Sequence, residues 1–182
     1  MSRNYKISDQ SQLHFISFAT IHWIDVFTRP AYKHIVVDSL NYCIKNKGLE
    51  VFAWCIMSNH VHLIIGSQKE NQSHIIRDLK KHTSKTIVKA IVDNPQESRK
   101  EWMLWMFERE GKRNSNNQDF QFWQQHNQPI ELNSNILIEQ KLNYIHNNPV
   151  EAGFVWAPQD YPYSSATDYA GQKGMVDIIL LN

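Results

Sequence analysis

Two histidines, one residue apart, begin the apolar part of the run MSNHVHLII at residues 57–65. Successive side chains of a β-strand point to opposite faces, so His60 and His62 share one face while Val61 and Leu63 point to the other. Two neighbouring imidazoles are typical ligands of a metal ion. The spacing alone leaves two interpretations open: a metal site, or histidines that are hydrogen bonded within the core.

A second segment, KLNYIHNNPVEAG at residues 141–153, has the pattern of a helix end. Residues three, four or seven apart share a helix face, so Lys141, Tyr144 and Asn148 point to the same side. We expect Pro149 to stop the helix, because its ring would clash with the carbonyl group one turn back. Tyr144 then lies one turn from the helix end. There its hydroxyl can reach out of the protein, whereas an ordinary tyrosine would pack at the core edge with its hydroxyl in water.

These two segments belong to a longer series of predicted elements. Apolar runs predict strands at 13–20, 49–57 and 60–66, with a two-residue turn at Ser58-Asn59. Apolar residues at helical spacing predict helices from Pro30 to Gly48, over 73–92, over 97–110 and from Ser134 to about Asn148. A polar loop is expected at 111–119, and the run FQFW at 120–123 is expected to open a fourth strand.

The predicted order is therefore strand, helix, strand, strand, helix, inserted helix, strand, helix. This is the split β-α-β order of a ferredoxin-like α+β sandwich, for which we expect an antiparallel sheet with helices on one face. We expect one domain over residues 1–182, with a helical and loop insertion at about 93–122 and a C-terminal tail at 150–182.

Composition narrows the class of protein. With 42% apolar and 20% charged residues, the chain is expected to be globular and not disordered. No apolar run approaches the roughly 20 residues that span a bilayer, and the polar segment 1–12 lacks the apolar part of a secretory signal. We therefore expect a cytoplasmic protein with no membrane partner. The net charge of +1 neither requires nor excludes nucleic acid.

Taken together, AWCIMSNHVH at 53–62 and YIHNNPVEAG at 144–153 resemble motifs of the single-tyrosine transposases of the HUH superfamily. The match is closer to the REP-associated tyrosine transposases, which pair a Met-Pro/Ser-Asn-His-hydrophobic-His-Leu strand with a later Tyr-Ile-His-x-Asn-Pro-Val-x-Ala-Gly helix end. The ending YPYSSA at 161–166 and the basic stretch 77–85 also fit. The resemblance thus runs from about Leu13 to Tyr169. Ser58 stands where many relatives have proline, a turn substitution that touches no chemistry.

The resemblance implies a reaction and a set of ligands. Tyr144 would attack a phosphate of single-stranded DNA, form a 5′-phosphotyrosine and release a 3′-hydroxyl, so that strands can be cut and rejoined. His60, His62 and Asn148, four residues after the tyrosine, would hold a divalent cation that neutralises the phosphate. With two imidazoles and an amide as ligands, Mg²⁺ or Mn²⁺ is expected. Lys141 would stabilise the phenolate or contact phosphate, unless it is an ordinary surface lysine.

The resemblance also implies a DNA partner, an imperfect hairpin with an adjacent single strand. One side of the predicted helix at 73–92 is basic, which indicates either phosphate contacts or a solvated face. The residues that we expect to contact DNA there are Arg77, Lys80, Lys81 and Lys85. Three tryptophans either stack on bases or pack in the core: Trp102, Trp105 and Trp123. The sequence leaves open whether the protein is a monomer or a homodimer.

Two other functional classes remain open. In the first, the chain is a non-catalytic nucleic-acid-binding module on a ferredoxin-like sheet, where His60 and His62 line a binding face and Tyr144 packs. In the second, it is a metal-dependent hydrolase that activates water. That chemistry needs a nearby carboxylate as base, and the two key segments contain only Glu151, beyond Pro149. A covalent protein–DNA adduct would distinguish the transposase from both.

Overall fold

The computed structural model describes residues 7, 9–69, 71–114, 119–125 and 127–181; residues 1–6 of the polar N-terminal segment and 115–118 of the predicted loop lie outside this part. The strands are β1 (His14–Ala19), β2 (Leu49–Ile56), β3 (His60–Ser67) and β4 (Ile130–Glu131). The helices are α1 (Pro30–Lys47), α2 (Gln72–Asp93), α3 (Lys100–Arg113), α4 (Asn135–Glu151) and α5 (Ala166–Tyr169). Short 3-10 turns, η2 (Ile21–Trp23), η3 (Val26–Thr28) and η4 (Pro158–Asp160), occur between these elements.

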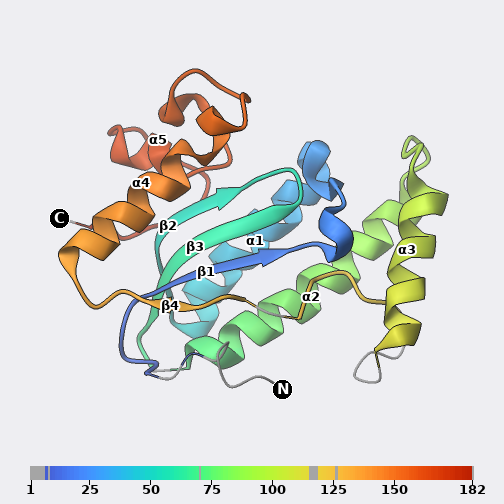
Figure 1. Cartoon of the computed structure of the whole chain (residues 1–182), viewed down its shortest axis with the longest axis horizontal. Coiled ribbons are helices and arrows are strands. Elements are labelled where there is room, and N and C mark those ends of the chain that lie inside the picture. The colour runs from blue at the N-terminus through green and yellow to red at the C-terminus, as the bar shows by residue number, and fades with distance from the viewer. Residues whose placement is uncertain (1–6, 8, 70, 115–118, 126, 182) are drawn as a thin grey trace.

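The four strands form one sheet in the order β2-β3-β1-β4, and each neighbouring pair is antiparallel. This confirms the predicted ferredoxin-like α+β fold, in which α1 and α2 are the two crossover helices. Both lie behind the sheet in Figure 1, while α4 lies in front of it. The prediction that the helices share one face is correct for α1 and α2 and wrong for α4. The front face carries Phe15, His62 and Ile64, all buried, so it is apolar enough to need a cover of its own.

The main core lies between the sheet and the two crossover helices. From β3 it receives Val61, Leu63 and Ile65, which are fully buried. These residues alternate with His60, His62 and Ile64, as the strand period requires. Burial of each aliphatic side chain contributes about 1.5–3 kcal/mol relative to exposure, which holds β3 firmly in register. The histidines on its other face therefore have a rigid support.

The segment predicted as the fourth strand, 120–123, is not a regular strand. It runs beside the end of β1, where Trp123 makes an isolated bridge with Thr20, and the regular ladder with β1 forms only at β4. The aromatic side chains of the segment explain the difference, because both Phe122 and Trp123 are buried. Trp123 Nε1 donates a hydrogen bond to Thr83 of α2 at 3.1 Å. Packing of both rings in the core replaces the alternation that a half-exposed strand would need.

The end of α4 also differs from the prediction. Pro149 lies inside the last turn, and the helix continues to Glu151. Gly153 ends the helix in the left-handed conformation, with φ of 73°. The amide of Gly153 donates to the carbonyl of Val150, and the amide of Phe154 donates to that of Pro149, both at 2.9 Å. This is the Schellman arrangement, which satisfies the last carbonyl groups and so sets the end of the helix.

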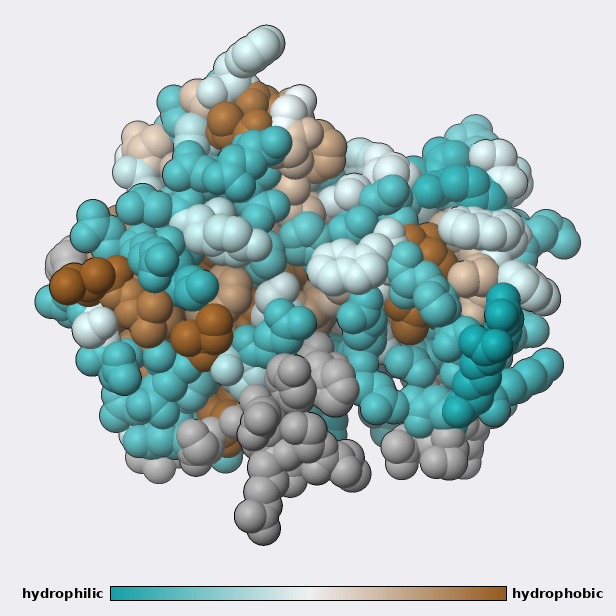
Figure 2. Space-filling view, viewed as in Figure 1, coloured by the Kyte–Doolittle hydropathy of each residue, from teal (hydrophilic) through white to brown (hydrophobic). Residues whose placement is uncertain are grey.

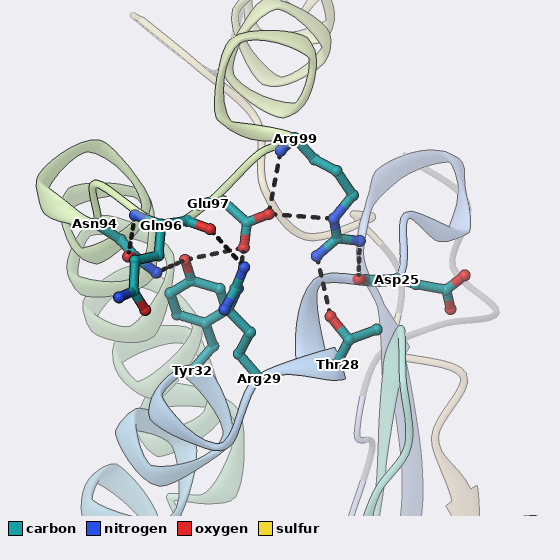
Figure 3. A network of polar contacts seen from close by, with 8 residues as sticks. All are labelled: Asp25, Thr28, Arg29, Tyr32, Asn94, Gln96, Glu97 and Arg99. Atoms are coloured by element: carbon teal, nitrogen blue, oxygen red, sulfur yellow. Dashed lines mark hydrogen bonds and ion pairs between the residues drawn. The ribbon is translucent and has the colours of Figure 1, made fainter.

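Glu97, predicted to begin the inserted helix, lies in the turn before α3, where its buried carboxylate joins two arginines (Figure 3). Arg29 Nε donates to it at 2.8 Å and Arg99 Nε at 3.2 Å. Burial alone would raise the pKa of Glu97, but these hydrogen bonds outweigh it and hold the pKa below its usual value. Arg99 also donates to the carbonyl oxygen of Asp25 at 2.8 Å and to Thr28 Oγ1 at 3.0 Å. The network thus ties the start of α3 to the segment between β1 and α1.

The surface in this view is mainly hydrophilic, with apolar side chains in separate patches over α4 and beside α3 (Figure 2). Within the described part of the chain, no helix combines the length and apolar character that crossing a membrane requires.

Candidate active site

The two histidines of β3 lie side by side on the sheet face that α4 covers. Ser17 and Ala19 of β1 pair with His62 and His60, so this part of β3 is held from one side by the ladder with β1. The ring centroids of the two histidines are 4.6 Å apart. His62 is buried and stacks on Phe15, with 5.6 Å between centroids, while His60 is only partly buried. The predicted shared face is therefore present, and one histidine is closer to solvent than the other.

Helix α4 brings the predicted tyrosine to these histidines. Ser134 caps its start by accepting a hydrogen bond from the amide of Leu137, and Ile145 is fully buried beneath the helix. The Tyr144 ring lies edge-on to His62, with 5.1 Å between centroids, and is 42% exposed. A tyrosine at this position has one side against the imidazole and the other open to a ligand.

The other two residues of this helix face complete the group. Asn148 Nδ2 lies 3.4 Å from Nε2 of His62. Lys141 Nζ lies over the rings of Phe15 and Tyr144, at 5.0 and 5.7 Å from their centroids. The structure therefore brings together five predicted site residues from two segments about 80 residues apart: His60, His62, Lys141, Tyr144 and Asn148.

Both imidazoles are neutral near pH 7. Burial lowers the pKa of His60, although contacts with Asn148 and Asp25 oppose the shift. Burial lowers the pKa of His62 to about 3, and the charge of Lys141 and any charge on His60 act in the same direction. A neutral imidazole keeps a nitrogen lone pair, so both rings are in the state that binds a cation.

A second layer of residues orients His60. Asn59 donates through Nδ2 to Asp25 Oδ1 and to the carbonyl oxygen of Trp23, both at 3.1 Å. Its amide oxygen then faces Nδ1 of His60 at 2.7 Å, which assigns the proton to Nδ1 and leaves the lone pair on Nε2. From the sequence, Asn59 was predicted only as a turn residue, and no role was predicted for Asp25 or Trp23. Of these three residues, only Asn59 could have been identified from the sequence, because it directly precedes a candidate metal ligand.

The two ring nitrogens of His62 have different surroundings. Among the described residues, its buried Nδ1 has no hydrogen-bond partner, while Nε2 faces Asn148. In the same part of the chain, no group of three or more His, Cys, Asp and Glu side chains could hold a metal ion. A cation at this site would therefore need the Asn148 amide in addition to the two histidines.

The basic residues of α2 lie on the other side of the sheet. Arg77, Lys81 and Lys85 are exposed and line a groove of about 610 Å³ between α2 and the segment 119–123. Arg77 is paired with its neighbour Asp78 at 3.0 Å. The residues that line this groove do not include the histidines, Tyr144 or Asn148, and the role of the groove in binding DNA stays a prediction.

Lys80 differs from its basic neighbours because its ammonium group is used inside the protein. Lys80 Nζ donates to the carbonyl oxygen of Gln124 at 2.8 Å and to Asn127 Oδ1 at 2.7 Å, and it lies 5.4 Å from the centroid of Phe18. Burial lowers the pKa of Lys80 to about 7. A phosphate contact through this group would have to replace bonds that hold the segment after Trp123.

His146 lies off the Tyr144 face, as the helix spacing indicated, and anchors α4 to the C-terminal tail. Its Nε2 lies 2.9 Å from Ser165 Oγ, which also accepts a hydrogen bond from the amide of Trp54 at 3.0 Å. Its ring packs at 5.0 Å from that of Tyr169. This histidine serves the docking of the helix that carries Tyr144.

The burial of His146 predicts loss of stability in acid. Burial lowers the pKa of His146 from 6.5 to about 4, so between these values the unfolded chain binds more protons than the folded one. The free energy of unfolding should then fall as the pH decreases from about 6.5 to about 4, by up to about 3 kcal/mol from this group. Urea unfolding in EDTA between about pH 4 and 7 measures the effect.

His146→Gln is the variant for this measurement, and its unfolding free energy should fall less steeply in acid than that of the wild type. The low pKa of His62 also makes stability depend on pH, but this contribution is the same in the wild type and in the variant. Equal slopes for the two proteins would contradict the prediction.

Comparisons with known proteins concern the family and the fold of this chain. Residues 8–148 match the family model described as "Transposase IS200 like", a span that contains both histidines, Tyr144 and Asn148. A structure of the REP-associated tyrosine transposase bound to a REP hairpin is similar, with a TM-score of 0.62 and 16% identity; the match covers 100% of this chain and 96% of that one. A crystal structure of a candidate transposase from Deinococcus radiodurans R1 gives a TM-score of 0.44 and 18% identity, covering 81% of this chain and 95% of that one. No curated protein sequence matches. Because the family model matches most of the length of this chain, the chain belongs to the family of IS200-like transposases.

Proposed function

We propose that this chain is a metal-dependent enzyme of the REP-associated type, which cuts and rejoins single-stranded DNA at hairpins through a covalent bond to Tyr144. The observation that carries the proposal is the position of an exposed tyrosine ring 5.1 Å from a neutral, buried histidine that itself adjoins a second histidine. The structural neighbour with the TM-score of 0.62 was solved with a REP hairpin, which supports DNA of that class as the substrate here.

The proposed reaction conserves the number of phosphodiester bonds. Tyr144 Oη attacks a DNA phosphorus and forms a P–O bond, while the bond from phosphorus to the 3′ oxygen breaks. The phenol gives up its proton and the leaving 3′ oxygen takes one up, so a 3′-hydroxyl is released. Attack by a 3′-hydroxyl on the phosphotyrosine reverses the step and rejoins strands. The partial exposure of Tyr144 leaves room for a DNA strand to approach it.

The residues present fit a divalent cation. Two atoms that each bind one ion at about 2.0–2.2 Å lie roughly 3 Å apart, and Asn148 is 3.4 Å from His62 Nε2. Rotation of the Asn148 amide exchanges its nitrogen for the oxygen that a cation prefers. The bond between Nδ1 of His60 and Asn59 leaves the lone pair of His60 on Nε2. When bound, Mg²⁺ or Mn²⁺ would neutralise the phosphate and polarise it for attack.

Lys141 supplies the remaining positive charge beside the tyrosine. Its ammonium group lies 5.7 Å from the centre of the Tyr144 ring. A cation at that distance attracts a phosphate and stabilises the negative charge that develops on the tyrosine oxygen in the transition state. We therefore assign Lys141 a role in both the activation of Tyr144 and the placement of the substrate.

A labelled hairpin DNA with a single-stranded flank, incubated with Mn²⁺ and resolved by denaturing electrophoresis, tests the proposal. The transposase should give a protein–DNA band that survives denaturation. A binding module would give no covalent band and no cleavage, and a hydrolase would cleave without the band. A hydrolase would need a carboxylate beside the metal to act as the base that activates water. The carboxylate of Asp25 bonds to Asn59, and Asn59 lies between it and His60, which disfavours the hydrolase.

The groove beside α2 provides a test of the DNA path. If Lys81 and Lys85 contact phosphates, each change to Ala should weaken binding about equally for all DNA sequences. Each lost contact should also flatten the plot of log affinity against log salt by about 0.7 to 0.9. Fluorescence anisotropy at several salt concentrations measures both. Lys89→Ala is the matched control, because Lys89 lies on the same helix outside the groove and pairs with Asp93. Unchanged slopes in the groove variants would identify a solvated face.

A further inference from the structure

An exposed tryptophan stands at the open end of the candidate active site. Trp23 is 54% exposed, and its ring lies edge-on to His60, with 5.6 Å between centroids. His60 in turn adjoins His62, and His62 adjoins Tyr144. Four rings thus form a row that begins at an exposed indole and ends at the proposed nucleophile.

The backbone that presents Trp23 is unusual. Both His22 and Trp23 have positive φ, 51° and 55°, a conformation that bulky residues seldom adopt. On either side of them Ile21 and Ile24 are buried, so the segment is pinned to the core at both ends. Such backbone strain persists only where the surrounding structure imposes it, and it is concentrated at functional sites.

Several polar contacts fix this segment from outside. Asn59 donates to the carbonyl oxygen of Trp23 at 3.1 Å, and His22 Nε2 lies 3.2 Å from the carboxylate of Glu110 on α3. The network of Glu97 and Arg99 holds the following residues (Figure 3). The segment lies beside the turn between β2 and β3 in Figure 1, so the same asparagine positions both His60 and the indole. The fold therefore imposes a rare backbone conformation on a partly exposed tryptophan.

We propose that Trp23 is the stacking platform for an unpaired nucleobase that flanks the phosphate cut by Tyr144. The inference rests on the proposed function and adds a binding residue to it. A base attached to a phosphate held at His60 and Tyr144 lies within reach of the neighbouring indole. Any base can stack on an aromatic face, so this contact holds the strand without reading its sequence.

The other exposed tryptophans provide a contrast. Trp102 and Trp105 are about as exposed as Trp23, and both lie on α3, while Trp156, after α4, is more exposed than any of them. Trp105 already lies under the guanidinium of Arg109, at 5.1 Å. Among the described residues, Trp23 is the tryptophan whose ring packs against a candidate ligand. Exposure alone therefore does not distinguish it, but its position beside His60 does.

The test uses a thymidine oligonucleotide with one 2-aminopurine, a fluorescent base whose emission is quenched when it stacks. Binding is measured in EDTA, so the readout does not depend on a metal or on catalysis. The wild type should quench the probe, and Trp23→Asn should lose the quenching and about tenfold in affinity. Asparagine tolerates positive φ, so this variant should keep the local backbone. Trp23→Phe should restore most of both signals, and Trp102→Ala should resemble the wild type.

The outcomes separate this inference from the proposed function. Quenching and affinity that are equal in the wild type and Trp23→Asn would overturn the inference, even if the wild type forms the covalent adduct with hairpin DNA and Mn²⁺. Absence of quenching in the wild type would also overturn it. If quenching follows Trp23 while no adduct forms in the wild type, the stacking site stands and the proposed reaction fails.

Discussion

Tyr144→Phe is expected to reduce the covalent adduct and DNA cleavage to background, while the affinity for DNA changes less than about threefold. The substitution removes only the oxygen that would attack phosphorus. The ring contacts with His62 and Phe15 remain available to phenylalanine, so the free energy of unfolding should change by less than about 0.5 kcal/mol. Denaturing electrophoresis of the adduct and anisotropy of the labelled DNA measure the two effects separately.

Tyr42→Phe is the control for this prediction. Tyr42 is another exposed tyrosine, 58% exposed, but it lies on α1, on the opposite side of the sheet from α4. This variant should form the adduct at the wild-type rate. Adduct formation that persists in Tyr144→Phe would place the nucleophile at another residue. Equal losses in both variants would point to a general effect on folding.

Replacement of His62 should have the second largest effect, because it is the more buried of the two histidines among the candidate ligands. We expect His62→Phe to lose most of its affinity for Mn²⁺ and to form no detectable adduct. Phenylalanine keeps a ring between Phe15 and Tyr144, and it removes a buried nitrogen that has no partner among the described residues. The fold should therefore survive, which separates loss of the metal from loss of structure.

Calorimetric titration of the protein with Mn²⁺ gives the affinity, and thermal unfolding checks the fold. His74→Ala provides a matched control, because His74 is an exposed histidine on α2, behind the sheet. EDTA should silence the wild-type enzyme in the adduct assay. Mn²⁺ affinity that is unchanged in His62→Phe, or full activity in EDTA, would remove the metal from the proposed mechanism.

Much of the local structure could be predicted from the sequence. The shared face of His60 and His62 follows from the two-residue period of a strand, and that of Lys141, Tyr144 and Asn148 from helical spacing. The order of the main elements was also predictable and gave the ferredoxin-like class. Each of these features depends on residues within a few positions of one another, so the sequence pattern contains what is needed.

The boundaries of helices and strands were less predictable where a tertiary contact competes with the conformational preference of the local sequence. Pro149 is a strong stop signal, yet the bonds at Gly153 set the end of α4. The run 120–123 has the composition of a strand, but its aromatic rings pack against residues of α2 and α3. Glu97 has a high helix propensity, and it instead binds Arg29, 68 positions away in the chain.

The sequence by itself determined which side chains share a strand or helix face, and hence the candidate chemistry of the two motifs. Only the tertiary structure decided that α4 covers the histidine face, with Asn148 within 3.4 Å of His62 across 86 positions of chain. It also decided that Asp25 and Asn59 hold His60, that Lys80 bonds within the protein, and that Trp23 stands beside the site. The physical reason is that periodicity fixes the direction of a side chain relative to its own element. Its partners depend on how whole elements dock, and docking is set by the burial of many residues at once.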